Sequence, residues 1–205
     1  MNSQNKASIT KILFLQSIEC VLNAINENKV NRVDKEIQYS LNSSLLLGLV
    51  LEGFINEIGE IKLDKFTWKE LEKSSTPLKW RIISSLVKGF PPNEEPLQTI
   101  IKLQKKRNNI AHPKLFNAEN DIIISNSQIL KMNPSDDFEL PNIDFNIYVG
   151  YQKLLNEYNS KDAYENLKKA FSAINNIIDL FQMRNHFEWI NEIDKEIKEL
   201  KIQQL

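Results

Sequence analysis

Residues 45–55 read LLLGLVLEGFI, the most apolar run in this 205-residue chain. Apolar side chains occupy more than one face of the helix that this run predicts, which is typical of an element surrounded by other helices. The helix begins near Asp34, a residue suited to cap it, and runs to about Ile58, with Gly59 suited to the position just beyond the end. The run is much shorter than the about 20 residues of a membrane span, so it predicts a buried central helix.

Outward from this helix, apolar residues recur at spacings of three and four in further segments, which predicts amphipathic helices. These segments are residues 8–27, 76–88, 94–111, 145–157, 160–183 and 187–203, with a short helix around 68–71. Residues 114–145 instead contain a β-branched stretch at 121–125 and turn-forming residues at 133–137. We expect a single all-α domain over residues 1–205. It would have four to five main helices, an irregular or β-hairpin insertion at about 114–145, and a C-terminal helix at about 187–203.

Composition limits the chemistry that the chain can perform. One cysteine, Cys20, excludes an intramolecular disulfide and a CxxC metal site, reads as a core residue, and fits a reducing cytoplasm. Two widely separated histidines nearly exclude a His/Cys zinc site, and the glycine-rich phosphate loop and the GxSxG and HExxH motifs are absent. A carboxylate-only magnesium site stays open, although no spacing argues for one, so we expect no metal and no cofactor. No secretory signal or membrane span is visible, which predicts a cytoplasmic protein with no membrane partner.

One segment combines a titratable group, a fixed cation and a forced break in the backbone: Arg107-Asn-Asn-Ile-Ala-His112-Pro113. Proline at 113 disfavours a helical conformation at His112, so the helix should end at about Ala111. On a straight helix Arg107 and His112 point roughly 140° apart, and they converge only if the helix ends between them. Asn108, four residues before His112, is better placed to orient the imidazole.

This segment supports two interpretations. Histidine exchanges a proton near neutral pH and arginine grips phosphate oxygens, which together suffice for RNA cleavage without metal. The plainer interpretation is that the helix dipole simply favours cations at a helix C-terminus. The basic residues around the motif are likewise either a solvated helix end or a phosphate track for RNA. They are Lys102, Lys105, Lys106, Arg107 and Lys114.

Several other residues with charged, titratable or aromatic side chains are expected to have structural roles. Glu52 and Glu57 are acids among apolar residues of the central helix, and we expect Glu57 to form a structural ion pair with Arg107 or Arg81. His186 lies at a helix junction, where a capping or packing role is expected. The three tryptophans are expected to anchor the core rather than to stack on bases; they are Trp68, Trp80 and Trp189.

The segment from Arg107 to Pro113 resembles the signature of the HEPN superfamily, in which an arginine and a polar residue precede a histidine at a helix end. The resemblance covers roughly residues 9–115 and 161–183. Within it, Glu52-Gly-Phe-Ile-Asn-Glu57 is similar to the long second helix of the family, and Leu78-Lys-Trp80 to the segment before the motif helix.

The resemblance implies a HEPN-like bundle in which His112 is the catalytic base or acid, Arg107 stabilises the phosphate and Asn108 supports them. Many family members are metal-independent endoribonucleases that act as toxins or in antiphage defence, and they typically dimerise with both motifs facing one cleft. RNA, tRNA included, a second copy of the chain, and an antitoxin or defence-complex protein are the implied partners. The alternative is a non-catalytic HEPN-like module for RNA binding or protein assembly. The insertion is not part of the family pattern, so it leaves substrate choice and dimer geometry open.

Overall fold

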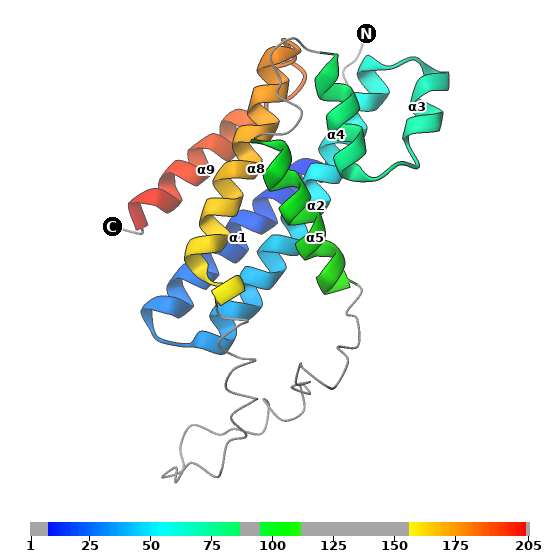
Figure 1. The fold of residues 1–205 in the computed structure, drawn as a ribbon. Coiled ribbons are helices and arrows are strands. Elements are labelled where there is room, and N and C mark those ends of the chain that lie inside the picture. The colour runs from blue at the N-terminus through cyan, green and yellow to red at the C-terminus, as the bar shows by residue number, and fades with distance from the viewer. Residues whose placement is uncertain (1–7, 87–94, 112–155, 204–205) are drawn as a thin grey trace, which may run out of the picture.

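The computed structural model describes residues 8–86, 95–111 and 156–203, and these ranges form seven helices and no strand (Figure 1). The expectation of an all-α bundle is therefore confirmed. The helices are α1 (Ile9–Lys29), α2 (Val33–Lys62), α3 (Lys65–Leu71), α4 (Thr76–Ser85), α5 (Leu97–Ala111), α8 (Ser160–Leu180) and α9 (Ile190–Gln203). The insertion at 114–145, with its expected strand, lies outside the described residues, as does most of the helix expected at 145–157.

Helix α2 is the centre of the bundle, as its apolar sequence predicts. It contacts α1, α3, α4, α5 and α8, while α9 covers α1 and α8 on the far side (Figure 1). Its fully buried apolar side chains are Leu47, Val50, Leu51, Phe54, Ile55 and Ile58. Apolar surface removed from water contributes roughly 25 cal/mol per Å², so this helix supplies much of the stabilisation of the bundle.

The first and last residues expected for α2 were both wrong. Arg32 is the residue before the first turn, and Asp34 lies inside that turn, where the helix dipole favours an anion. At the other end the helix continues through Gly59 to Lys62. A Cβ at position 59 would lie 2.2 Å from the Trp68 ring of α3, so the glycine makes room for the indole instead of ending the helix.

Most of the other helices begin close to their expected positions. Helix α3 is capped by Asp64, whose carboxylate accepts hydrogen bonds from the backbone of Phe66 and Thr67. Helix α4 begins at Thr76, the first residue of the expected range 76–88, with Ser75 before the helix and a proline in the first turn. Helix α9 begins at Ile190, three residues after the expected start, because residues 184–189 form turns.

Two buried polar contacts fix the bundle. The carboxylate of Glu36, 2% exposed, accepts hydrogen bonds from Asn28 Nδ2 at 2.9 Å and from the backbone N–H of Ser160 at 2.8 Å, which ties together α2, the end of α1 and the start of α8. Trp80 is fully buried, and its Nε1 donates to the backbone oxygen of Leu51 at 3.0 Å, which holds α4 against α2. A buried indole N–H needs such a partner.

The burial of the tryptophans and the cysteine can be compared with the expected core. Trp68 and Trp80 are buried and Trp189 packs partly buried against the core, so their expected anchoring role is confirmed. Cys20 is only half-buried on α1, not fully inside as expected, and partial burial together with the nearby Glu19 raises the pKa of its thiol. None of the described helices is long and apolar enough to cross a bilayer.

Candidate functional site

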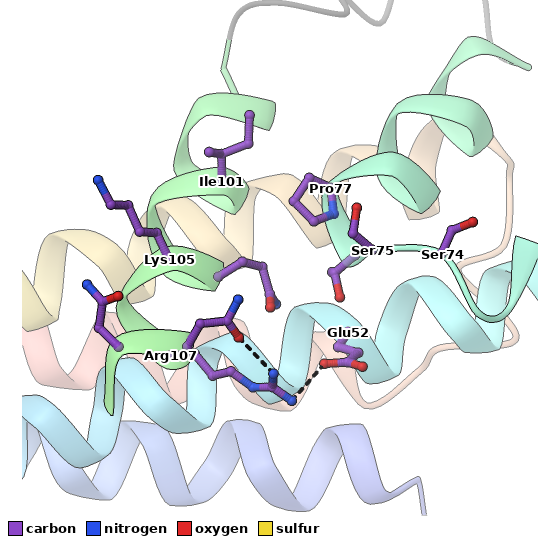
Figure 2. Close-up of a pocket in the computed structure, with 11 residues that line it drawn as sticks. Glu52, Ser74, Ser75, Pro77, Ile101, Lys105 and Arg107 are labelled. Carbon is purple, nitrogen blue, oxygen red and sulfur yellow. Dashed lines mark hydrogen bonds and ion pairs between the residues drawn. The ribbon is translucent and has the colours of Figure 1, made fainter. Parts of the chain in front are cut away.

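A cleft of about 690 Å³ opens where α2, α4 and α5 meet (Figure 2). Helix α2 contributes Glu52, and the start of α4 contributes hydroxyl groups and a proline. Helix α5 contributes amides, two cations and one apolar side chain. The lining residues are Glu52, Ser74, Ser75, Thr76, Pro77, Ile101, Gln104, Lys105, Arg107, Asn108 and Asn109. The cleft therefore includes Arg107, Asn108 and Lys105 from the expected site.

Helix α5 approaches α2 closely because position 48 is a glycine. A Cβ at Gly48 would lie 2.7 Å from Cβ and 3.0 Å from Cγ of Arg107. The carbonyl oxygen of Gly48 accepts a hydrogen bond from the buried Gln104 Nε2 at 2.7 Å. Glu52 follows Gly48 by one helical turn on the same face of α2, so the crossing also brings Arg107 beside Glu52.

The guanidinium of Arg107 is held from two sides (Figure 2). Its Nη2 lies 3.2 Å from Glu52 Oε2, and its Nη1 donates to Asn108 Oδ1 at 2.9 Å. Its Nε is buried and has no hydrogen-bond partner among the described residues. The Arg107 and Glu52 side chains are 26% and 33% exposed, so the ion pair lies at the cleft surface and not deep in the core.

The expected ion pair of Glu57 with Arg107 or Arg81 was wrong, and Glu52 is the partner of Arg107. Glu57 accepts hydrogen bonds from Ser8 Oγ at 2.9 Å and Thr10 Oγ1 at 2.5 Å at the start of α1. Five helical positions rotate a side chain by roughly 140°, so Glu52 and Glu57 face different neighbours. Each acid follows a glycine by four residues, Gly48 before Glu52 and Gly53 before Glu57, so the local sequence does not show which acid pairs with Arg107.

The basic residues of α5 divide between two faces of the helix. Lys105 is exposed and lines the cleft, whereas Lys102 is exposed outside it. Lys106 donates from Nζ to the backbone oxygen of Glu157 at 2.6 Å and lies 4.6 Å from the ring centroid of Tyr158. Burial lowers the pKa of the Lys106 ammonium, and the nearby Lys102 adds to the effect. Lys106 thus fastens the segment that leads into α8.

Two of the expected site residues, His112 and Lys114, lie outside the described residues. The other histidine, His186, is exposed after α8 with its ring edge-on to Phe187 at 4.8 Å, which agrees with a packing role. Over the described ranges, no group of three or more His, Cys, Asp or Glu residues could hold a metal ion. The hydroxyl-rich wall of the cleft at residues 74–76 was not anticipated, although a Ser-Ser-Thr-Pro helix start is visible in the sequence.

Comparison with family models, with curated proteins and with solved structures finds no match to the chain. The geometry of the cleft and the sequence motif therefore carry the functional argument.

Replacing Gly48 with alanine tests the helix crossing. The new Cβ would meet Arg107 Cβ, which cannot move without moving α5, and overpacking typically costs about 1–3 kcal/mol. Better helix propensity offsets about 1 kcal/mol, so we expect Gly48→Ala to lower the free energy of unfolding by about 1 kcal/mol in urea titrations. Gly53→Ala is the comparison, because its Cβ would meet the Thr10 hydroxyl at 2.8 Å, and moving that hydroxyl costs its hydrogen bond to Glu57 but shifts no helix. Equal gains in both variants would contradict the close approach.

Proposed function

We propose that the protein is a metal-independent endoribonuclease of the HEPN type, which cleaves RNA by attack of a 2′-hydroxyl on the adjacent phosphate. One observation carries the proposal: the Arg107 guanidinium lies in the wall of a cleft, supported by Asn108, near the C-terminal end of α5. In a metal-free reaction, protein cations must stabilise the charge that develops on the phosphate oxygens. Arg107 supplies that charge, and Lys105 adds a second cation in the same cleft.

The hydrogen bonding of Arg107 supports a ligand in this position. A guanidinium has five N–H groups, and its partners among the described residues are Glu52 and Asn108. A phosphate group that entered the cleft would offer the guanidinium further acceptors in a bidentate arrangement.

The second catalytic group of the proposal is His112, which follows Ala111, the last residue of α5, in the sequence. As base or acid it exchanges the proton that the reaction moves, while Asn108 supports Arg107. The products are a 2′,3′-cyclic phosphate and a 5′-hydroxyl. Lys102, Lys105 and Lys114 are the proposed contacts to the RNA backbone, with Lys105 best supported because it lines the cleft, whereas the ammonium of Lys106 is bound to Glu157 and Tyr158.

The resemblance to the HEPN superfamily supplies the biological part of the proposal. In it, two copies of the chain form a homodimer whose motifs share one composite site, and the enzyme acts in the cytoplasm as a toxin or an antiphage-defence (abortive infection) effector. An antitoxin or a defence-complex protein would restrain it until it is needed.

One observation favours a second candidate, a non-catalytic HEPN-like module for RNA binding or protein assembly. The aliphatic part of Arg107 packs against Gly48 and its guanidinium pairs with Glu52, which is a sufficient structural role for an arginine. Measured cleavage separates the two candidates.

The test is to incubate the purified protein with tRNA and with total RNA in EDTA. We expect cleavage that leaves cyclic phosphate ends, and a rate at least about 100-fold lower in His112→Ala, because general acid–base groups typically contribute that much. His186→Ala is the matched control, since this exposed histidine lies after α8. Cleavage that survives both His112→Ala and Arg107→Ala would refute the mechanism. RNA binding without cleavage by the unaltered protein would favour the non-catalytic module. Growth inhibition on expression, relieved by His112→Ala, would support the toxin role.

A further inference from the structure

Glu52 is the one carboxylate among the described residues that line the cleft. The other described lining residues offer hydroxyls, amides, apolar groups and the cations Lys105 and Arg107. Hydroxyls and amides do not accept a proton near neutral pH, and a charged lysine or arginine has none of the required lone pairs. Within this part of the cleft, Glu52 is therefore the group equipped to act as a base.

The geometry places Glu52 beside the proposed phosphate position. Glu52 from α2 and Arg107 from α5 both line the cleft and point toward each other, with Glu52 Oε2 3.2 Å from Arg107 Nη2 (Figure 2). In RNA the attacking 2′-hydroxyl and the scissile 3′-phosphate sit on neighbouring carbons of one ribose. A phosphate held by the guanidinium therefore brings this hydroxyl next to the Glu52 carboxylate. The Glu52 side chain is one-third exposed and lines the cleft, so a substrate in the cleft can contact it.

We propose that Glu52 is the general base of the reaction, a role that rests on the proposed function. A Glu52 oxygen takes the proton of the 2′-hydroxyl while O2′ forms a bond to phosphorus. The P–O5′ bond breaks with its electron pair on O5′, which takes a proton from the acid of the reaction. The cyclic phosphate and the 5′-hydroxyl leave, and Glu52 returns its proton to water. With Glu52 as the base, the role proposed for His112 is that of the acid.

A positioning role for Glu52 makes a different demand on the side chain. To hold Arg107, the residue needs only an oxygen that accepts the Nη2–H, which glutamine also provides at nearly the same size. To act as a base, it needs a group that ionises, which glutamine lacks. Glu52→Gln therefore separates the two roles, and Glu52→Asp keeps the ionisable group at shorter reach.

The experiment measures kcat/KM against pH for cleavage of a short single-stranded RNA by the full chain. We expect Glu52→Gln to lower kcat/KM about 100-fold and to remove the acid limb of the pH profile, because protonation of a base causes that limb. Glu52→Asp should be partly active and keep the limb. Glu57→Gln is the matched control: it changes another acid on α2, bonded to Ser8 and Thr10, and should keep both the rate and the limb. Thermal melts establish that each variant is folded.

A Glu52→Gln enzyme that keeps the acid limb and most of the rate would overturn the assignment and leave the carboxylate as a positioning group, with the proposed function intact. Failure of the unaltered protein to cleave any RNA would overturn the proposed function and this role together. Were Glu52→Gln unfolded, loss of the limb in Glu52→Asp would overturn the role, and a retained limb with reduced rate would support it.

Discussion

Replacing Arg107 with alanine is expected to slow RNA cleavage about 1,000-fold, the upper part of the range for removing one group that stabilises developing negative charge. The loss should appear mainly in kcat, because the guanidinium acts most strongly on the charge that builds up at the phosphate during the reaction. Single-turnover cleavage of a labelled RNA in EDTA measures this directly.

Two further variants make this result interpretable. Arg107→Lys keeps the charge but loses the planar, bidentate grip, so its rate should fall between those of the wild type and Arg107→Ala. Lys105→Ala removes the exposed cation of the same cleft and should raise KM more than it lowers kcat. The ion pair of Arg107 with Glu52 is partly exposed, and pairs of that kind contribute at most about 1 kcal/mol, so the alanine variant should remain folded. An Arg107→Ala protein as active as the wild type would refute the assigned role.

Replacing Trp80 with alanine is expected to lower the free energy of unfolding by about 3–5 kcal/mol, the usual cost of emptying a fully buried aromatic site. For a chain of this size, that corresponds to roughly 10 °C in Tm. The effect should extend to the cleft, because Trp80 bonds the carbonyl of Leu51, the residue directly before Glu52.

Trp80→Phe isolates the hydrogen bond from the volume of the ring. It keeps the aromatic packing against Phe54, whose ring centroid lies 5.8 Å away, but leaves the Leu51 oxygen without the indole donor. We expect about half the loss of Trp80→Ala in urea or thermal unfolding. A Trp80→Ala protein as stable as the wild type would contradict the anchoring role of this side chain.

The helices could be predicted from the sequence because periodicity reports which faces are apolar. The apolar run at 45–55 identified α2 as central, and the helix predicted over 76–88 from its apolar spacing begins where α4 begins. The same local information misled at Gly59. A glycine that ends a helix and a glycine that admits an indole ring look alike until the position of Trp68 is known.

The site could be predicted in part for a similar reason. Arg107 and Asn108 were identified from their motif, but the partner of Arg107 depends on which turn of α2 crosses α5. That crossing is set by Gly48, 59 residues earlier in the chain. Lys106 was expected to contact RNA together with its neighbours, and its contacts with residues 157 and 158 could not be read from a local pattern.

The contact between Lys106 and Glu157 has a consequence for protein engineering. Lys106 lies five residues before the end of α5, and residue 157 comes three before the start of α8, so this hydrogen bond joins the end region of α5 to the residues directly before α8. Glu36 adds a second fastening at Ser160. These contacts hold the end of α5 and the start of α8 together within the described helices. We therefore expect the helical body to tolerate changes in the number of residues between positions 111 and 156.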